Sequence, residues 1–388
     1  MRFVHFADTH LGFSDLSKVE AATGVNRREQ DFYDAWWRVI DAILAQRPDF
    51  VLHAGDLFQS ARPNNRAIAV ALEGLQKLSA AGIPIVVVAG NHSTPRVRAT
   101  GSIFEAMSVL PNVHAAYRGV YEKFTLRSRT GRDTCAVHCI PHCSLSEELE
   151  KAYTALQLDS SARWNVLVTH GSWRAPGKID TRMGEFNEQF LEDPEARLNV
   201  TFDYIALGHY HRHLAINDHT FYSGSTERTS FNEAGYTSGY LVGDLREKSW
   251  QYHTIPARPM HRLRPIDCRG KSIEEIISEA QARSSDELAG ALLTLEFRRI
   301  SRELYLQLDL AALDAVFAHA FHLNKQFTFD TPISSTEPTQ AEQLGIGSLR
   351  EEFSRFLLSR SNGTLPRTEL ERLGWEYLAA AETLEPEA

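Results

Sequence analysis

The stretch FVHFADTHLG, residues 3–12, decides the fold because it joins a short apolar strand directly to the pair Asp8-x-His10. Later apolar strands also end on metal-binding residue types: Asp56 follows residues 50–54, Asn91 and His92 follow 83–89, His170 follows 165–169, and His209 and His211 follow 204–207. Ligands of α/β sheets bind beyond the carboxyl ends of the strands, so we expect these blocks to converge. Neighbouring glycines would let backbone and metal approach closely.

The first 250 residues predict a layered α/β domain, since short apolar strands alternate with helical patterns. Apolar residues recur at three- and four-residue spacing over 29–46, and a second helix is predicted for 65–80, after Pro63. Strands after Asp203 follow one another without helices between them. The predicted fold class is therefore α/β, with two packed mixed β-sheets flanked by helices. The predicted strands are 3–7, 50–54, 83–89, 135–140, 165–169, 204–207, 219–222 and 239–242.

Beyond residues 1–255, changes in pattern divide the chain into three further parts. Residues 256–332 predict a small α/β domain, residues 333–344 a linker rich in helix breakers, and residues 345–388 two amphipathic helices. The small domain is expected to contain strands at 262–267, 291–297 and 326–329 and helices at 273–282 and 310–322. The terminal helices are expected at about 349–358 and 367–381.

Composition excludes several classes of protein. The 388 residues are 43% hydrophobic and 23% charged, which excludes wholesale disorder. No apolar run approaches the roughly 20 residues that span a bilayer, and no signal peptide or membrane association is expected. Four cysteines cannot form a disulfide framework, so we expect a cytoplasmic protein.

The net charge of −9 argues against a protein that grips nucleic acid through bulk positive charge. Residues 1–250 hold 26 Lys and Arg against 29 Asp and Glu, whereas residues 301–388 hold 7 against 14. The excess acid therefore lies mostly near the end of the chain. Residues 51–100, where several blocks lie, are net positive, with 5 basic against 2 acidic side chains. An enzyme with local, metal-borne contacts to phosphate is not excluded.

The donor set indicates which ions would bind. It combines carboxylates, imidazoles and one carboxamide without a thiolate, which suits two octahedral ions such as Mn²⁺, with Mg²⁺ or another divalent ion as alternatives. Asp56 is the natural bridging ligand, because one carboxylate can hold two cations about 3.5–4 Å apart. A water between them would have a lowered pKa and attack phosphorus in line. His92 is expected instead to stabilise phosphoryl oxygens or to protonate the leaving oxygen.

These blocks resemble those of the calcineurin-like metallophosphoesterases. More specifically, they resemble the nuclease subunit of DNA double-strand-break repair complexes: the bacterial SbcD exonuclease and its relatives in the meiotic-recombination-eleven family. The resemblance rests on residues 8–12, 55–58, 90–92, 169–171 and 208–211, and on 224–228 (GSTER), which generic phosphatases lack. It covers about residues 1–245, and beyond them only the domain order matches.

The resemblance implies a site and an activity. Asp8, His10, Asp56 and His211 would bind one Mn²⁺, Asp56, Asn91, His170 and His209 would bind the other, and His92 would be the catalytic histidine. The implied reaction is hydrolysis of DNA phosphodiesters, typically as a 3′→5′ exonuclease on duplex ends and an endonuclease on single strands or hairpins. Residues 256–332 would form a capping domain.

The resemblance also implies partners besides DNA. It implies a homodimer through helices of the phosphoesterase domain. The helices within 345–388 would clasp the coiled coil of an SbcC-type ABC ATPase, and their ordinary alternative is packing onto the capping domain.

Two positions depart from the family pattern. Ser93 stands where the family usually has Asp after the catalytic histidine, and a hydroxyl gives the imidazole less electrostatic support than a carboxylate. Gln59 stands where the family usually has His or Asp. We expect both changes to affect rate and substrate preference more than metal binding.

Other residues have weaker claims to a role. Arg96 and Arg228 are candidates for contacts to DNA phosphates, because arginine pairs bidentately with phosphate oxygens. Trp173 and Arg174 are as well explained by loop packing as by DNA contact, and His53 and His213 are interpreted as structural or surface residues. A zinc site is not expected among residues 135–143, despite Cys135, His138, Cys139, His142 and Cys143, because no second ligand pair lies at a suitable spacing.

Two other functions compete with a two-metal DNA nuclease. One is a phosphoesterase with the same metal core that acts on a small molecule or a phosphoprotein. The other is a mainly architectural subunit that bridges an ATPase and DNA ends, with weak catalysis because of Ser93 and Gln59.

Overall fold

The computed structural model describes residues 1–16, 18–95, 97, 100–174, 181–185, 187–330, 353, 357 and 367–382. It forms two compact units, Met1–Phe329 and Asp330–Ala388. The predicted linker at 333–344 lies outside the described residues, as does nearly all of the helix predicted at 349–358. None of the described helices is both long and apolar enough to cross a membrane.

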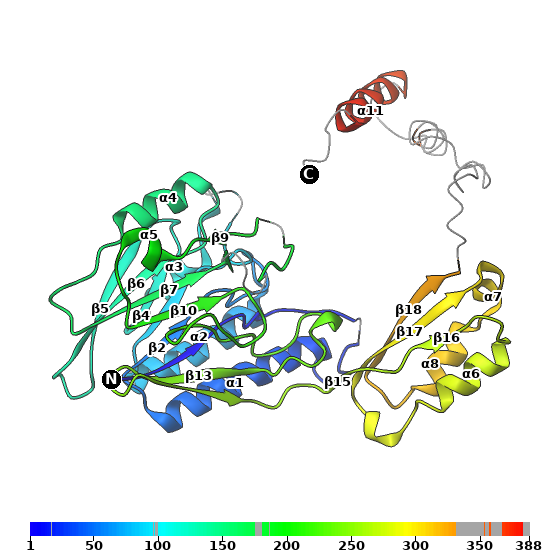
Figure 1. Ribbon diagram of the computed structural model, residues 1–388, viewed down its shortest axis with the longest axis horizontal. Coiled ribbons are helices and arrows are strands. Elements are labelled where there is room, and N and C mark those ends of the chain that lie inside the picture. The colour runs from blue at the N-terminus through cyan, green and yellow to red at the C-terminus, as the bar shows by residue number, and fades with distance from the viewer. Residues whose placement is uncertain are drawn as a thin grey trace. The chain divides into compact units, whose positions relative to one another are not determined.

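Two six-stranded mixed sheets form the centre of the first unit (Figure 1), which confirms the predicted fold class. The first sheet has the order β14-β13-β1-β2-β3-β4 and contains β1 (Arg2–Phe6), β2 (Phe50–His53), β3 (Ile85–Val88), β4 (Val113–Ala116), β13 (Gly239–Asp244) and β14 (Ser249–Thr254). The second has the order β11-β12-β10-β7-β6-β5 and contains β5 (Glu122–Arg127), β6 (Thr134–Ile140), β7 (Trp164–His170), β10 (Tyr204–Gly208), β11 (Leu214–Ala215) and β12 (Thr220–Tyr222). β1, β2 and β3 run parallel, as do β7 and β10, so their carboxyl ends share an edge in each sheet.

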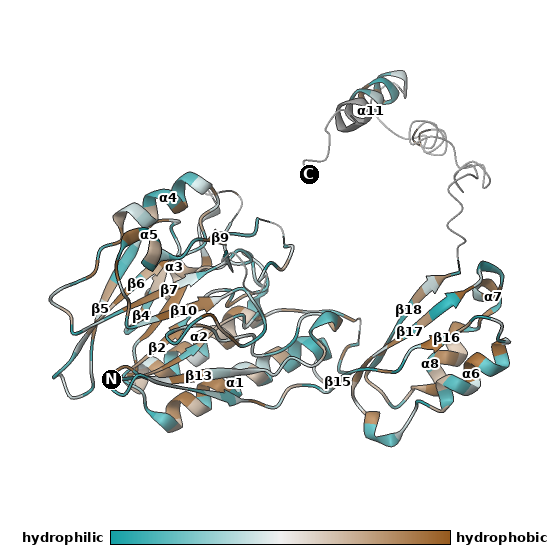
Figure 2. Cartoon of the chain, viewed as in Figure 1, coloured by the Kyte–Doolittle hydropathy of each residue, from teal (hydrophilic) through white to brown (hydrophobic). Residues whose placement is uncertain are grey.

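Strand β1 has two buried faces because its side chains alternate between two cores. Val4 and Phe6 face the helices, while Phe3 and Ala7 join the core between the sheets. Figure 2 shows the resulting apolar colour along the central strands. Between the sheets, the ring of His5 is hydrogen bonded through Nδ1 to the Tyr204 hydroxyl at 2.9 Å.

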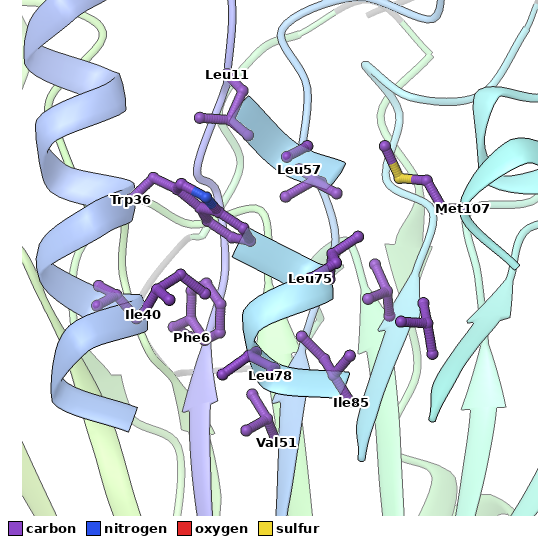
Figure 3. Packing of buried hydrophobic residues seen from close by; sticks show 14 of the residues in the cluster. Phe6, Leu11, Trp36, Ile40, Val51, Leu57, Leu75, Leu78, Ile85 and Met107 are labelled. Atoms are coloured by element: carbon purple, nitrogen blue, oxygen red, sulfur yellow. The ribbon is translucent and has the colours of Figure 1, made fainter. Parts of the chain in front are cut away.

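Helices α1 (Arg27–Gln46) and α2 (Asn65–Ala80) cover the first sheet, and both begin at an asparagine cap. The side chain of Asn26 accepts from two backbone N–H groups of α1, and that of Asn64 accepts from Ala67 N of α2. Figure 3 shows the apolar side chains that fill the space between these helices and the strands, among them Phe6, Trp36, Ile40, Val51, Leu75, Leu78 and Ile85.

Gly74 of α2 permits the close contact with α1, because a Cβ there would lie 2.4 Å from Trp36 Nε1. We expect Gly74→Ala to lower the free energy of unfolding. Overpacking a full core costs about 1–3 kcal/mol, which exceeds the roughly 1 kcal/mol that alanine gains in helix propensity. Thermal unfolding against Gln76→Ala, on the exposed face of α2, tests this. An unchanged or higher Tm would contradict it.

The second sheet has its own cover. Its outer face packs against α4 (Ser146–Ala155) and α5 (Pro194–Leu198) through a separate apolar cluster that includes Tyr153 and Leu207. The remaining elements of this region are α3 (Ile103–Met107), the short pair β8 (Ser172–Trp173) and β9 (Phe190–Leu191), and the 3-10 turn η2 (Phe231–Glu233). β8 and β9 begin and end the loop that carries Glu185 and Glu188.

Within the first unit, residues 260–329 have an apolar core of their own and a four-stranded sheet, and their assignment to a separate small α/β domain stays a prediction. Its elements are β15 (Met260–Arg262), β16 (Ile266–Asp267), α6 (Ile273–Gln281), η3 (Asp286–Leu288), β17 (Leu292–Ile300), α7 (Arg302–Gln307), α8 (Leu310–Val316) and β18 (His322–Phe329). The single strand predicted at 262–267 is two short strands, and the helix predicted at 310–322 ends at Val316. Arg258 joins this part to α1, with Nε and Nη2 each 2.6 Å from a carboxylate oxygen of Asp31.

The second unit contains α11 (Arg367–Glu382), close to the helix predicted at 367–381. A Cβ on Gly374 would lie 2.1 Å from the ring of Phe353, so this ring packs directly on α11. Trp375 of the same helix is exposed.

Candidate metal centre

The five sequence blocks meet at the carboxyl ends of β1, β2, β3, β7 and β10, and this arrangement confirms the expected convergence. Asp8 lies opposite the second sheet, where its carboxylate accepts from the backbone N–H of His209 at 2.9 Å. Asp56 accepts from the backbone N–H of His92 at 3.0 Å. Asp8, His10, Asp56, His170, His209 and His211 are all at most 2% exposed. Four of the five blocks thus deliver buried side chains to one cluster, whereas Asn91 and His92 of the fifth block are partly exposed.

One group of potential ligands consists of Asp8, His10 and His211, whose ligand atoms lie within 4.8 Å of one another. The Nε2 atoms of His10 and His211 are 3.1 Å apart. An imidazole nitrogen binds a cation through the lone pair with which it would otherwise accept a hydrogen bond. Two such nitrogens that face each other beside a carboxylate therefore suit one shared ion. The three residues come from the set predicted for the first ion.

A second group consists of Asp8, Asp56 and His170. His170 Nε2 lies 3.1 Å from Asp56 Oδ2 and 3.0 Å from Asn91 Oδ1, which brings the carboxamide oxygen into the same cluster. The ring of His209 lies beside that of His170, with centroids 5.3 Å apart. Asp56, Asn91, His170 and His209 are the residues predicted for the second ion. A further group of His10, Asp56 and His92 links the two sets.

The local backbone explains why glycine precedes these ligands. Gly55 has φ +102°, and a Cβ there would lie 2.1 Å from His170 Nδ1. A Cβ on Gly90 would lie 2.2 Å from Asp56 Oδ1. Asp8, His10 and Asp56 themselves have positive φ angles of 51°, 46° and 50°, an unfavourable conformation that the surrounding packing must maintain.

The residues present fit two divalent cations. The donors are carboxylate oxygens, imidazole nitrogens and one carboxamide oxygen, without sulfur, and they are packed so closely that like groups face each other. Two buried carboxylates, Asp8 and Asp56, belong to a common group, which is a costly arrangement unless positive charge lies between them.

Three glutamates that could not be recognised from the sequence contact histidines of the site. Glu233 of η2 holds His211, with Oε1 2.9 Å from Nδ1. Glu188 holds His209, with Oε1 2.8 Å from Nε2. Glu185 Oε2 lies 3.1 Å from His92 Nε2 and 2.9 Å from Asn91 Nδ2. These residues lie in irregular segments, where no hydrophobic period marks a functional side chain.

Burial and neighbouring charges set the protonation of the site. Burial opposes a charge on His211, but the carboxylate of Glu233 outweighs it and raises the pKa of His211 to about 10. Burial is the largest cause that lowers the pKa of His10 and raises that of Asp8. Asp56 is also buried, yet the imidazole of His170 holds its pKa well below its usual range. The metal-free cluster therefore stabilises itself with imidazolium–carboxylate pairs.

His92 is oriented by groups other than its neighbour Ser93. Its Nδ1 faces the main-chain carbonyl of Gln59 at 3.1 Å, and its Nε2 faces Glu185. Burial disfavours its charged form, but Glu185 and Asp56 raise the pKa of His92 to about 9. Ser93 is fully buried, and its hydroxyl has no hydrogen-bond partner among the described residues. The support that an aspartate would give at position 93 comes here from Gln59 and Glu185.

We expect Glu233→Ala to weaken binding of the ion at His211 by about 10–100-fold, because the carboxylate orients the ring and raises its basicity. Calorimetric titration with Mn²⁺ should show one weakened and one unaffected binding event. Glu247→Ala, which removes an exposed glutamate from the turn between β13 and β14, is the matched control. Equal weakening of both ions, or of neither, would contradict this role.

Arg228 does not lie on an open surface. It is 8% exposed, and its Nη2 donates to the main-chain carbonyl of Arg258. Arg28 Nη2 donates to the carbonyl of Arg228 at 2.6 Å. The GSTER block, residues 224–228, thus connects the sheets to the start of the small α/β domain, and a contact of Arg228 to DNA stays a prediction. Arg96 lies outside the described residues.

The residues interpreted as structural have structural partners. His53 Nε2 is 2.7 Å from the Thr9 hydroxyl, and the ring of His213 stacks on Tyr252 with centroids 4.1 Å apart. Trp173 is buried in the outer core of the second sheet. Among residues 135–143, both ring nitrogens of His138 are hydrogen bonded, to Tyr121 and Asn165. The three cysteines of this run, Cys135, Cys139 and Cys143, are buried.

Comparison with known proteins identifies related chains. The calcineurin-like phosphoesterase family matches residues 1–213. The DNA double-strand break repair protein Mre11 of Thermoplasma acidophilum is 32% identical over 248 residues, 61% of this chain and 58% of the relative. The Mre11 protein of Methanococcus maripaludis is 31% identical over 275 residues, 66% of this chain and 68% of the relative.

A third relative extends the match. The Mre11 protein of Haloferax volcanii is 31% identical over 312 residues, which cover 76% of this chain and 61% of the relative. The chain thus spans between 58% and 68% of the length of these three proteins.

Proposed function

This chain belongs to the Mre11 family of calcineurin-like phosphoesterases, and on this premise we propose that it is a metal-dependent nuclease acting in DNA double-strand-break repair. The observation that carries the proposal is the convergence of five strand-end blocks on one buried cluster of carboxylates, imidazoles and a carboxamide. The relatives named above supply the substrate class. The competing reading as a phosphatase of small molecules or proteins has no observation of its own in its favour.

The two groups of potential ligands described above indicate which residues would hold each ion. Asp8, His10 and His211 would hold one ion together with Asp56, and Asp56, Asn91, His170 and His209 would hold the other. Two Mn²⁺ ions, or other divalent cations, would supply Lewis acidity and a water of lowered pKa for attack on phosphorus. Glu233 and Glu188 orient His211 and His209 within these sets.

His92 would act as a proton donor toward the substrate. A main-chain carbonyl can only accept, so Nδ1 facing Gln59 O must carry a proton. Nε2 faces a carboxylate, so it also carries a proton, and the ring is a cation. A cationic donor at this position can stabilise the phosphoryl oxygens and deliver a proton to the leaving oxygen.

The partners are also proposals. We infer a homodimer formed by helices of the phosphoesterase domain and a coiled-coil ABC ATPase bound by the C-terminal helices. The exposed Trp375 on α11, in the most acidic part of the chain, supports a role in binding a protein more than one in binding DNA. The four free, buried cysteines are in keeping with a cytoplasmic location.

The test is a Mn²⁺-dependent assay on end-labelled single-stranded, duplex and hairpin DNA, with and without the candidate ATPase. We expect 3′→5′ removal of nucleotides from duplex ends and internal cuts in single strands and hairpins. Hydrolysis of nitrophenyl phosphate without cleavage of any DNA would overturn the proposal in favour of a phosphatase.

The affinity for metal should rise with pH. A protonated imidazole cannot bind a cation, and His211, with its pKa raised to about 10, must lose a proton when the ion enters. In the metal-free protein, the contribution of His211 to folding stability depends on pH in the opposite direction and falls as the pH rises. The stability that the His211–Glu233 pair contributes is fully present below the unfolded pKa of 6.5, and it is lost as the pH rises toward 10.

Calorimetry with Mn²⁺ between pH 6.5 and 9, in buffers of different ionisation enthalpy, measures both affinity and proton release. We expect release of about one proton from His211 at pH 7. A pH-independent affinity without proton release would contradict the protonation of the cluster.

A further inference from the structure

Residues 181–185 and 187–189, between β8 and β9, reach the metal centre, where Glu188 holds them. The Glu188 carboxylate accepts from the backbone N–H groups of Met183 at 2.8 Å and Gly184 at 3.0 Å. The same carboxylate contacts His209 Nε2. Its side chain is 6% exposed. The backbone just before Glu185 is therefore fixed against a residue of the metal centre.

Glu185 extends from this anchor into the space in front of His92. Its Oε2 lies 2.9 Å from Asn91 Nδ2, 3.1 Å from His92 Nε2 and 3.8 Å from His209 Nδ1. These three groups come from the ends of β3 and β10, in different sheets. The side chain is 25% exposed and lines a cavity of about 560 Å³ that also contains Gln59 and Arg62. The carboxylate thus stands between the metal cluster and an open cavity.

The orientation of Asn91 shows on which side of the cluster the carboxylate lies. The carboxamide oxygen of Asn91 faces His170 at 3.0 Å, on the side of the proposed ligands, whereas its nitrogen faces Glu185. The other close partner of Glu185, His92 Nε2, is also a donor. A carboxylate oxygen whose two hydrogen-bond partners are both N–H donors occupies an anion position rather than a cation position.

We propose that Glu185 occupies the position of a phosphoryl oxygen of the substrate and that a DNA phosphate must displace it, so that Glu185 is an internal competitor of the substrate. A carboxylate oxygen and a non-bridging phosphate oxygen are both anionic acceptors, and the N–H at His92 Nε2 cannot donate to both at full strength. This inference rests on the proposed function for the identity of the phosphate as part of DNA.

Displacement is possible because Glu185 itself, unlike Glu188, is partly exposed. When the side chain swings into the open cavity, His92 and Asn91 keep their positions through contacts of their own. His92 remains bound to the carbonyl of Gln59, and Asn91 to His170. The arrangement favours ligands that bring a phosphate with strong additional contacts, as a nucleic acid backbone does, over free inorganic phosphate.

The test uses the full chain loaded with Mn²⁺ and inorganic phosphate as the probe. Calorimetry should show that Glu185→Ala binds phosphate about 10-fold more tightly than the unaltered protein, the effect expected from removing one charge-assisted competitor. Glu185→Gln, which removes the charge and keeps the volume, should give an intermediate increase. Glu192→Ala, whose side chain is 63% exposed beyond β9, should leave the affinity unchanged.

Electron paramagnetic resonance of the same proteins measures how much Mn²⁺ is bound and does not depend on catalysis. We expect the Mn²⁺ affinity of Glu185→Ala to equal that of the unaltered protein. A loss of Mn²⁺ affinity would make Glu185 a metal ligand and overturn the proposal. Phosphate binding that is equal, weaker or undetectable in both proteins would overturn it as well.

These outcomes are independent of the proposed function. If the phosphate affinity rises as expected but no DNA is cleaved, the nuclease proposal fails, whereas the proposal that Glu185 competes with phosphate stands. If DNA is cleaved but Glu185→Ala binds phosphate no more tightly than the unaltered protein, the proposal for Glu185 fails and the nuclease proposal stands.

Discussion

Asp56→Asn should abolish measurable hydrolysis of DNA and prevent the site from holding two ions. Asp56 is a member of two of the three ligand groups, and its Oδ2 lies 3.1 Å from His170 Nε2. Loss of its charge should cost more than the 10–100-fold in metal affinity that removal of an orienting partner costs. Because each ion contributes several kcal/mol to the transition state, the rate should fall by about 10³-fold or more.

The measurement combines Mn²⁺ stoichiometry with a DNA cleavage rate. Asp286→Asn, an exposed residue of η3 in the small α/β domain, makes the same chemical change away from the site and should have no effect. A variant at Asp56 that still binds two ions and cleaves DNA at the original rate would show that the carboxylate does not bridge.

His92→Ala should separate chemistry from metal binding. The ring donates to Glu185, and the hydrogen bond from His92 to Asp56 comes from its backbone N–H, which alanine retains. We expect the cleavage rate to fall by about 10²–10⁴-fold, the usual range for the loss of a general acid. Calorimetry should find both ions bound with nearly unchanged affinity.

His261→Ala, an exposed histidine of β15, is the control. Unchanged cleavage by the His92 variant would remove His92 from the mechanism. Loss of an ion in that variant would instead make His92 a ligand, in agreement with its place beside His10 and Asp56.

Much of the fold followed from local sequence, because the deciding signals are short-range. The helix predicted at 65–80 has the observed bounds of α2, since Pro63 and Asn64 set its start. Eight strands of the two sheets were predicted because they are mostly apolar, whereas β4, β5, β11 and β14 were missed. β5 was missed because it is polar, with alternating exposed side chains, and its strand conformation depends on pairing with β6.

The candidate site, like the fold, has parts that could be predicted from the sequence and parts that could not. The potential ligands were predictable because each directly follows an apolar strand, so the parallel sheet order brings them together. Glu185, Glu188 and Glu233 were not predictable, since each reaches its histidine from a loop or a short turn through long-range contacts. The burial of Arg228, a candidate for a phosphate contact, could not be predicted because an exposed arginine and a buried one have the same sequence signature. Only the packing of Arg28 and Arg258 around it reveals its structural role.

The central claim is that two divalent cations held by one buried cluster carry out hydrolysis of DNA. The most direct test is a titration of the metal-free protein with Mn²⁺ in which the number of ions bound and the cleavage rate of an end-labelled single strand are followed together. Our account predicts that cleavage appears as the second ion binds and that two ions bind per chain. Full cleavage with one ion per chain, or in the presence of excess chelator, would contradict it.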